Sequence, residues 1–383
     1  MSHELIDRID RLLPMLRDRA HETHDKGISV DTMEQLAATG FFRLMQPRQW
    51  GGEAADPMLA FEAIRRLSGA CGSTGWVASV LGVHPWHLAQ FDQQAQQDVW
   101  GQDPNALVCS SYAPMGMATP VEGGYRVSGN WRYSSGSAHA QWAMVGAPIP
   151  EQLAFGAFLI PRAEYSIEEV WDTFGLRGTQ SNTLVVEDVF VPAHRFLNFE
   201  TMGAFEAPGL QVNDEPLFRM PWGTVFPAAI GTPVIGMAHG AWDLYVEYQG
   251  KRQRAAYFGE RATDDPFIAL RVGETGSDID ASWEQLSGNI SKVYDLVAAG
   301  EEVPMELRMK ARRDQVRAVQ RCVAAADSLI ESAGAAALDN DQRLQLLWRD
   351  IRAARHQATN EPERVHVMFG RHMFKLDPGQ NMV

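Results

Sequence analysis

The sequence predicts an α+β protein in which a block of strands lies between two helical blocks. Apolar residues recur at helical spacing over the first hundred residues and again beyond residue 220. Between them, short alternating runs are separated by Gly, Pro, Asn and Asp, which is typical of strands. Segregated blocks of this kind favour α+β over an alternating α/β sheet. We place the domains at residues 1–104, 105–205 and 206–383.

The first block reads as a series of helices. Its first helix carries apolar residues at helical spacing: Ile6, Ile9, Leu12, Leu13 and Leu16. Asp31 is expected to cap a second helix that ends near Gly40, and Pro57 suits the first turn of a helix over residues 58–68. An apolar run from residue 72 predicts a buried helix that breaks before Pro85. A short polar helix is expected over residues 93–100.

The middle block predicts a small antiparallel barrel or sandwich of about 100 residues. Five runs read as its strands: 107–109, 125–127, 142–145, 154–159 and 183–190. Within residues 123–147 a Gly-Gly turn opens the segment, Ser128 and Gly129 form a second turn, and Ser134, Ser135 and Ser137 make a hydroxyl-rich patch near Trp131. Such a patch suits a flat, hydrogen-bonding heterocycle. An ordinary β-meander with a Ser-rich turn fits the same residues.

The last block predicts a helical bundle. A link bearing Pro and Gly covers residues 206–221, and the periodic apolar pattern then returns. We expect its helices over residues 234–248, 266–293, 304–336 and 342–359.

Composition and charge limit the partners. The 383 residues are 45% hydrophobic and 21% charged, and 48 acidic against 34 basic side chains leave a net charge of −14. Such a surface repels nucleic acid and anionic membranes, so neither is expected as a partner. Cys71, Cys109 and Cys322 are odd in number and far apart, which fits a reducing, cytoplasmic setting. The first twenty residues lack the apolar core of a signal peptide.

Several common catalytic motifs are absent. No GxGxxG follows a strand, and neither GxxxxGK[ST], HExxH nor GxSxG occurs. His84 and His87 lie three residues apart, but Pro85 separates them and no Cys or carboxylate cluster accompanies them. We therefore expect no metal site, and a loop that lines a pocket is the better interpretation of GVHPWH.

Three blocks together resemble the acyl-CoA dehydrogenase superfamily. They are GGYRVSGNWRYSSGSAHAQW, WDTFGLRGTQSNTLVVEDVFVPAHR and RDIRAARHQATNEPE, and with the order of the domains they cover nearly the whole chain. The resemblance implies the acyl-CoA dehydrogenase-like fold, with N-terminal helices, a middle β-domain and a C-terminal four-helix bundle. It also implies a flavin between the middle domain and the bundle, in a homotetramer.

Two departures from the dehydrogenases indicate a different reaction. Where a catalytic carboxylate is often found, seven residues after Asp350, this chain has Gln357, preceded by His356. The phrase SSYAPMG replaces the acidic T-E-P-x-A-G-S-D signature that contacts flavin and acyl-CoA. Both departures resemble the oxygenase components of two-component flavin monooxygenases, group D.

Within group D the chain is most similar to the type that hydroxylates 3-hydroxy-9,10-secoandrostatrienedione. GVHPW, SSYAPMG, SSGSAHAQWAMVGA and the terminal ERVHVMFGRHMFKLDPGQNMV carry that similarity, and 4-hydroxyphenylacetate hydroxylases are more distant. The resemblance implies reduced FMN or FAD supplied by a separate flavin reductase. Its reaction with O2 to a C4a-hydroperoxyflavin then hydroxylates an aromatic, phenolic substrate.

Two other functions stay open on sequence alone. An acyl-CoA dehydrogenase or oxidase with tightly bound FAD would keep the fold but lacks its carboxylate here. A scaffold that has lost the flavin would keep only the fold. The substrate is equally open among a steroid catabolite, a polyketide phenol and an indole.

Residues for the flavin ring follow from the resemblance. Ser134 or Ser135 is assigned to the N5 edge, with Ser135 also a catalytic candidate, and Ser110 and Ser111 to the ring edge and the oxygen pocket. Trp131 is expected to flank the isoalloxazine. Turn residues with a core Trp are the structural alternative.

The proton of a phenol needs a base, and an imidazole that titrates near neutrality suits this task. His356 is the first candidate and His372 in GRHMF the second, while His84 and His139 rank after them. Asn360 or Glu361 is expected to orient His356.

The flavin phosphate and the substrate need further residues. For the phosphate, the resemblance points to basic residues that reach a neighbouring subunit's flavin: Lys251, Arg252, Arg254 and Arg271. A solvated basic turn explains the first three equally well. Arg177 and Thr179 in GLRGTQSN are further cofactor candidates. For the substrate we assign His84, Trp86 and Tyr112.

Overall fold

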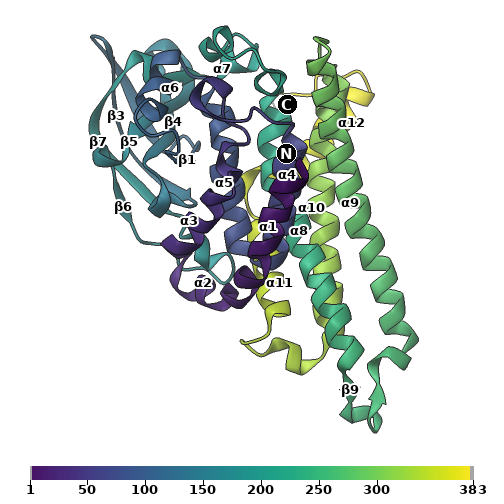
Figure 1. Ribbon diagram of the computed structural model, residues 1–383. Coiled ribbons are helices and arrows are strands. Elements are labelled where there is room, and N and C mark those ends of the chain that lie inside the picture. The colour runs from purple at the N-terminus through teal and green to yellow at the C-terminus, as the bar shows by residue number, and fades with distance from the viewer. Residues whose placement is uncertain (1, 380–383) are drawn as a thin grey trace.

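The N-terminal domain is helical throughout. The computed structural model describes residues 2–379 (Figure 1). The helices of this domain are α1 (Ser2–Asp18), α2 (Ala20–Lys26), α3 (Val30–Ala38), α4 (Pro57–Ala70), α5 (Gly72–Leu88) and α6 (Gln93–Trp100). The end of the terminal motif, residues 380–383, lies outside the described residues.

Two helix boundaries differ from the prediction. Ser29, not Asp31, caps α3, because its hydroxyl accepts a hydrogen bond from the Thr32 amide at 3.2 Å, whereas Asp31 pairs with Arg19 at 2.6 Å. The helix α5 also does not break before Pro85 but continues to Leu88. Every residue of α5 is buried, so packing on all sides outweighs the one hydrogen bond that proline removes.

The middle domain consists of two four-stranded sheets that enclose a shared core. One sheet has the order β1 (Val108–Ser111), β4 (Trp142–Ile149), β5 (Ala154–Pro161) and β8 (Phe196–Asn198). The other has the order β2 (Gly116–Val121), β3 (Gly124–Ser134), β7 (Asn182–Pro192) and β6 (Ser166–Glu168). The predicted antiparallel arrangement is confirmed for five of the pairs, while β1 and β4 run parallel.

The strand β3 is longer than predicted. Ser128 and Gly129 do not form a turn, and the strand runs on to Ser134 with an irregularity in its pairing with β7 between Val127 and Gly129. The Ser128 hydroxyl accepts a hydrogen bond from the Asp188 amide at 2.9 Å. A β-bulge therefore takes the place of the expected turn.

The C-terminal domain is a bundle of long helices. They are α8 (Trp222–Lys251), α9 (Pro266–Ala298), α10 (Met305–Ala333), α11 (Arg343–Ala354) and α12 (Pro362–Met373), and the short α7 (Phe199–Gly203) precedes them. A small hairpin of β9 (Gln253–Arg254) and β10 (Glu260–Arg261) joins α8 to α9. The predicted α+β order of helices, sheets and bundle is confirmed.

The last predicted helix, 342–359, ends earlier than expected, at Ala354, and a further helix that was not predicted follows it. After α11 the chain makes a short turn, and Pro362 opens α12, where its fixed φ suits the first helical position. Val365 and Met368 of α12 bury their side chains against Met309 and Val316 of α10. This apolar contact holds α12 against the bundle, beyond the end of the last predicted helix.

The helix α5 connects the two halves of the molecule. It lies between the β-domain and the bundle (Figure 1) and contacts α4 and α8 on one side and β1 on the other. Both halves therefore present side chains to the same helix. Among residues 2–379, no helix is long and apolar enough to cross a membrane.

The crossing of α4 and α8 depends on glycine. A Cβ added at Gly240 would lie 2.3 Å from the Gly69 carbonyl oxygen, and one at Gly236 would lie 2.2 Å from the Arg65 carbonyl oxygen. We expect Gly240→Ala to lower the free energy of unfolding by about 1–3 kcal/mol, because two backbones must separate. Chemical denaturation measures it. Gly288→Ala in α9, with open space around its Cβ, is the control and should be neutral or stabilising. Equal effects of both substitutions would contradict the prediction.

Candidate active site

A chain of hydroxyl groups joins the ends of two strands of the β-domain. Ser135 follows β3, and its hydroxyl lies 2.7 Å from that of Ser181, which lies 2.7 Å from that of Thr179. Thr179 donates to the Leu176 carbonyl oxygen at 2.8 Å. At the other end, the Trp76 indole of α5 donates to Ser135 at 3.1 Å. We call Ser135, Ser181 and Thr179 the hydroxyl chain.

The backbone around the hydroxyl chain is unusual. Gly136 has a φ of +71°, and a Cβ there would lie 2.9 Å from Val77 of α5. Leu176 and Gln180 also have positive φ, at 53° and 44°. The Gly136 amide bonds the Thr179 carbonyl oxygen at 3.1 Å, so the two turns brace each other. Strained residues of this kind persist where the surrounding structure holds them, and they cluster at functional sites.

A buried carboxylate ties the second turn to the bundle. The Asp350 Oδ1 of α11 accepts a hydrogen bond from the Leu176 amide at 2.6 Å. Asp350 is only 2% exposed, and a Cβ at Gly72 of α5 would lie 2.5 Å from its Oδ2. Burial raises the pKa of this carboxyl to about 7. The three segments α5, α11 and the Leu176 turn therefore meet at one carboxyl group.

Two histidines of α5 meet polar side chains at the end of β1. The Nδ1 of His84 lies 2.5 Å from the Val108 carbonyl oxygen, and its Nε2 lies 2.9 Å from the Ser110 hydroxyl. The Nδ1 of His87 lies 2.6 Å from the Tyr112 hydroxyl, with the two rings 5.1 Å apart. We call His84, Ser110, Tyr112 and His87 the histidine array.

The histidine array is neutral at physiological pH. Burial lowers the pKa of His84 to about 4 and that of His87 to about 3, and it raises the pKa of Tyr112 above its usual value. Because the Nδ1 of His84 faces a carbonyl oxygen, it must carry the proton. Its Nε2 is then an acceptor, and the Ser110 hydroxyl donates to it.

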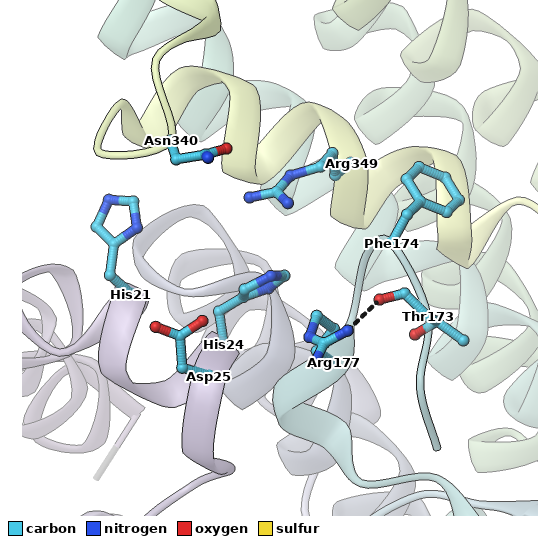
Figure 2. A pocket seen from close by; sticks show the side chains of 8 residues that line it. All are labelled: His21, His24, Asp25, Thr173, Phe174, Arg177, Asn340 and Arg349. Carbon is cyan, nitrogen blue, oxygen red and sulfur yellow. Dashed lines mark hydrogen bonds between the residues drawn. The ribbon is translucent and has the colours of Figure 1, made fainter. Parts of the chain in front are cut away.

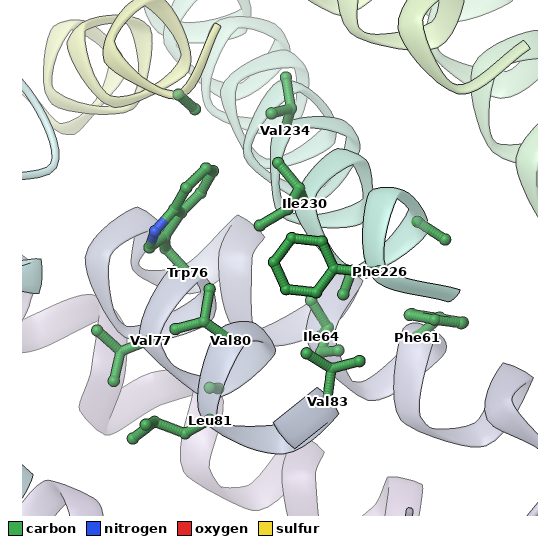
Figure 3. Close-up of a cluster of buried hydrophobic side chains, with 14 of the residues drawn as sticks. Phe61, Ile64, Trp76, Val77, Val80, Leu81, Val83, Phe226, Ile230 and Val234 are labelled. Carbon is green, nitrogen blue, oxygen red and sulfur yellow. The ribbon is translucent and has the colours of Figure 1, made fainter. Parts of the chain in front are cut away.

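Aromatic and aliphatic side chains surround the array. Phe226 of α8 stacks on Trp222 at 4.8 Å and meets Tyr112 edge-on at 5.5 Å. Figure 3 shows Trp76 and Val80 of α5 pointing toward α8, on the side of that helix that carries Phe226. This wall is apolar apart from the array and the hydroxyl chain, as sites for flat organic ligands usually are.

Several predicted site residues lie within the cores instead. Trp131 is fully buried in the β-domain and donates to the Gly146 carbonyl oxygen at 2.7 Å, so it does not present a face to a ligand in this structure. Trp86 is likewise buried and donates to the Leu217 carbonyl oxygen at 3.0 Å. Ser134 has no exposed surface, and the Ser111 hydroxyl bonds the Arg132 carbonyl oxygen at 2.8 Å.

The other histidines predicted as the catalytic base lie in different parts of the fold. His356 is exposed in the turn after α11, and its side chain makes no hydrogen bond with any described residue. His372 lies on α12, across the bundle from the β-domain (Figure 1). Half-buried His139 follows the Ser-rich turn, and burial lowers its pKa.

Asn360 does not orient the imidazole of His356. Its amide bonds the Gln315 side chain at 2.7 Å and the Ala354 carbonyl oxygen at 2.9 Å. Glu361 lies near Arg364, at 3.6 Å, and not against His356. The fully buried Asn360 instead fixes the backbone of the turn that carries His356.

The basic residues expected at the flavin phosphate do not reach the hydroxyl chain of their own chain. Arg252 contacts the Ser332 carbonyl oxygen and the Tyr248 ring, and Arg254 pairs with Asp265. They lie at the β9 end of the bundle, away from the β-domain (Figure 1). Arg271 bonds the Ser328 hydroxyl at 2.8 Å, and exposed Lys251 pairs with Glu247 at 2.6 Å.

Arg177 points away from Thr179, although both belong to one turn. It pairs with Asp172 at 2.5 Å and donates to the Thr173 carbonyl oxygen at 3.1 Å. Thr179 belongs to the hydroxyl chain, and its assignment to the cofactor stays a prediction. The predicted pair therefore serves two different places in the fold.

Sequence reasoning missed Trp76, Ser181 and the role of Asp350. Ser181 carried a weak signal, because it is the second hydroxyl residue in GLRGTQSN, just before a strand. Trp76 carried none, since an indole in an apolar helix reads as core. Among the described residues, no group of three His, Cys, Asp or Glu side chains is suited to a metal ion.

Comparisons with known proteins identify the family to which this architecture belongs. The family model described as the acyl-CoA dehydrogenase N-terminal domain matches residues 10–103, and that of the C-terminal domain matches residues 228–361. The flavin-dependent monooxygenase oxygenase subunit HsaA of Rhodococcus jostii (strain RHA1) is 55% identical over 382 residues, which cover 99% of this chain and 100% of the relative. The chain belongs to the acyl-CoA dehydrogenase superfamily, in its flavin-dependent monooxygenase branch.

Two further comparisons agree with this branch. The crystal structure of 3-HSA hydroxylase from Rhodococcus sp. RHA1 is 54% identical and superposes with a TM-score of 0.96 over all of both chains. The FADH(2)-dependent resorcinol hydroxylase oxygenase component of Rhizobium sp. (strain MTP-10005) is 37% identical, covering 98% of this chain and 95% of the relative. The predicted fold, superfamily and monooxygenase activity are confirmed, and the oxygenase is flavin-dependent.

Proposed function

We propose that this oxygenase hydroxylates a phenolic ring, using O2 and reduced flavin that a separate reductase supplies. The observation that carries the proposal is the placement of the histidine array and the hydroxyl chain along the single helix α5. One set offers hydrogen bonds to a phenol and the other to a flavin. The 54% identical structure is described as a 3-HSA hydroxylase, so 3-HSA is the first substrate to test.

The hydroxyl chain fits the edge of a flavin ring. An isoalloxazine has both donor and acceptor atoms on its edge, and a hydroxyl group can serve either kind. The Trp76 indole orients Ser135 from one side and Ser181 from the other, so the hydroxyl is already positioned before a ligand arrives. Reduced flavin, when bound, would supply the activation of O2. FMN and FAD fit these contacts equally.

The histidine array suits the hydroxyl of a phenol. Because Ser110 donates its own proton to His84, its oxygen lone pairs are free to accept from a substrate hydroxyl. When the phenol donates this hydrogen bond, the electrons of its O–H bond shift toward the oxygen. The ring then becomes richer in electrons and more reactive toward an electrophilic oxygen. His84 is too weak a base to take up the proton at neutral pH, so it positions Ser110.

We assign the final uptake of the phenol proton to His356, after that proton has left its hydrogen bond with Ser110. It lies six residues beyond Asp350, which is connected through the Leu176 turn to the hydroxyl chain. The turn that carries it is held by Asn360, so its backbone is fixed. An imidazole at the surface exchanges its proton with water between turnovers, which a buried imidazole does poorly.

The cofactor assignments of Arg252, Arg254 and Arg271 require a homotetramer. These residues lie at the far end of the bundle from the hydroxyl chain of their own chain, so they would bind the flavin phosphate of a neighbouring subunit.

We also propose that the oxygenase works in the cytoplasm. Its three cysteines are free and buried, which fits a reducing compartment.

Isotope labelling tests the proposed reaction. The protein is mixed without oxygen with chemically reduced FMN or FAD and 3-HSA, and ¹⁸O2 is then added. We expect the new hydroxyl group on the ring of the product to carry one ¹⁸O atom. Flavin oxidation that yields only H2O2 with 3-HSA, resorcinol and 4-hydroxyphenylacetate would overturn the assignment to phenols.

Replacing Ser135 by Ala tests the hydroxyl chain. We expect the fraction of reduced flavin converted to hydroxylated product to fall about tenfold, because one positioned hydrogen bond to the flavin edge is lost. The ratio of product to H2O2 measures it. Ser137→Ala is the control, since this buried hydroxyl in the same turn makes no hydrogen bond among the described residues. Equal coupling in both variants would exclude Ser135 from the site.

A further inference from the structure

A polar pocket lies beside the Leu176 turn, the turn that also carries Thr179 of the hydroxyl chain. It has a volume of about 420 Å³ and lies between α2, the loop 173–177 and the start of α11 (Figure 2). Arg177 faces this pocket, whereas Thr179 of the same turn faces Ser181. We call it the Arg349 pocket. The reaction proposed above uses none of the residues that line it.

The Arg349 pocket is rich in positive charge that lacks partners. The guanidinium group of Arg349 makes no hydrogen bond or ion pair with any described residue, and its Nε is buried. Arg177 is the second guanidinium, and it pairs with the exposed Asp172 and donates to the Thr173 carbonyl oxygen. Figure 2 shows Arg349 and Arg177 on facing sides of the pocket, with Arg177 bound to Thr173. The single carboxylate of the lining is Asp25 at the exposed rim.

Two imidazoles add unpaired nitrogens to the same wall. His24 is only 8% exposed, and its Nδ1 has no hydrogen-bond partner among residues 2–379. The Nε2 of His21 is also buried without a partner in that range. A buried polar atom that makes no hydrogen bond costs about 1–3 kcal/mol, so three such atoms around one cavity favour the binding of a polar ligand there.

The positive charge of Arg349 acts on His24 directly. Burial and, to a smaller extent, the nearby positive charge of Arg349 together lower the pKa of His24 to about 4. An anion between these two side chains would remove the repulsion and would accept hydrogen bonds from both. Arginine suits phosphate oxygens in particular, because its planar fork donates two parallel hydrogen bonds.

The size of the cavity points to more than an inorganic ion. Phe174 at its rim is 52% exposed and offers an aromatic face to a flat ring. Asp25 and Asn340 provide groups that bond sugar hydroxyls. We propose that the Arg349 pocket binds a nucleotide, with its phosphate on Arg349, Arg177 and His24 and its base on Phe174. This inference stands apart from the phenol hydroxylase proposal.

Calorimetry with the full chain tests the proposal. ADP, inorganic phosphate and adenosine are titrated at constant ionic strength, and we expect ADP to bind, phosphate to bind more weakly and adenosine not to bind. Arg349→Gln should weaken ADP binding tenfold or more, roughly the loss of one charge-assisted hydrogen-bond pair. Arg352→Gln, one turn along α11 and paired with Asp327 outside the pocket, is the control and should bind ADP as before.

A second variant keeps the test independent of folding. Phe174 is exposed, so Phe174→Ala should fold normally, weaken ADP binding and leave phosphate binding unchanged. Competition then identifies the source of the nucleotide. Displacement of ADP by FAD but not by FMN assigns the pocket to the adenylate part of FAD, and no displacement by either assigns it to a free nucleotide. Absence of ADP binding at millimolar concentration, or equal binding to Arg349→Gln, overturns the proposal.

Discussion

Replacing His356 by Asn is expected to lower the rate of phenol hydroxylation about 100-fold. The imidazole is assigned to take up the phenol proton, and Asn cannot accept one. Reduced flavin would still react with O2, so the oxygen that no longer reaches the ring should leave as H2O2. Binding of the phenol should change little, since Ser110 and Tyr112 provide its hydrogen bonds.

Rapid quenching with reduced flavin measures product and H2O2 from the same reaction. His372→Asn is the matched control, because His372 lies on α12 and makes no side-chain hydrogen bond with the described residues. Full coupling in His356→Asn, or a loss in His372→Asn instead, would move the base to another residue.

The second large effect concerns Asp350 and stability. Its folded-state pKa of about 7 lies above the ordinary aspartate value of 3.8, so between these values the folded state binds more protons than the unfolded state. Stability is then unaffected near pH 4 or below, falls as the pH rises from about 4 to about 7, and stays constant above that. The loss is about 4 kcal/mol at most.

Asp350→Asn should remove this loss, because the amide oxygen still accepts the hydrogen bond of Leu176 and never ionises. We expect equal stability of variant and wild type near pH 4 and a more stable variant at pH 8. Denaturation at several pH values measures the difference. Asp172→Asn, an exposed carboxyl beside the same turn, is the control and should not gain stability with pH. A constant difference for Asp350→Asn across this range would contradict the buried, raised pKa.

Much of the architecture follows from local patterns. The spacing of apolar residues and the Gly and Pro between runs predict the order of helices, sheets and bundle, and the motifs of the middle domain indicate the superfamily. The predictions from sequence are wrong where local preferences of the chain compete with tertiary packing. Pro85 predicts a helix end, but complete burial keeps α5 intact, and Ser128 with Gly129 reads as a turn although pairing with β7 holds a bulge.

The sequence by itself determined the fold class, the superfamily and the serine-bearing turn that includes Ser135. Only the tertiary structure decided what those groups touch. Trp76 lies 59 residues from Ser135, and Leu176 lies 174 residues from Asp350, yet each pair shares a hydrogen bond. The same packing buries Trp131 in the core and leaves Arg349 without a partner among residues 2–379. Hydrogen bonds and desolvation depend on which elements come together, and no local pattern of residue types specifies that.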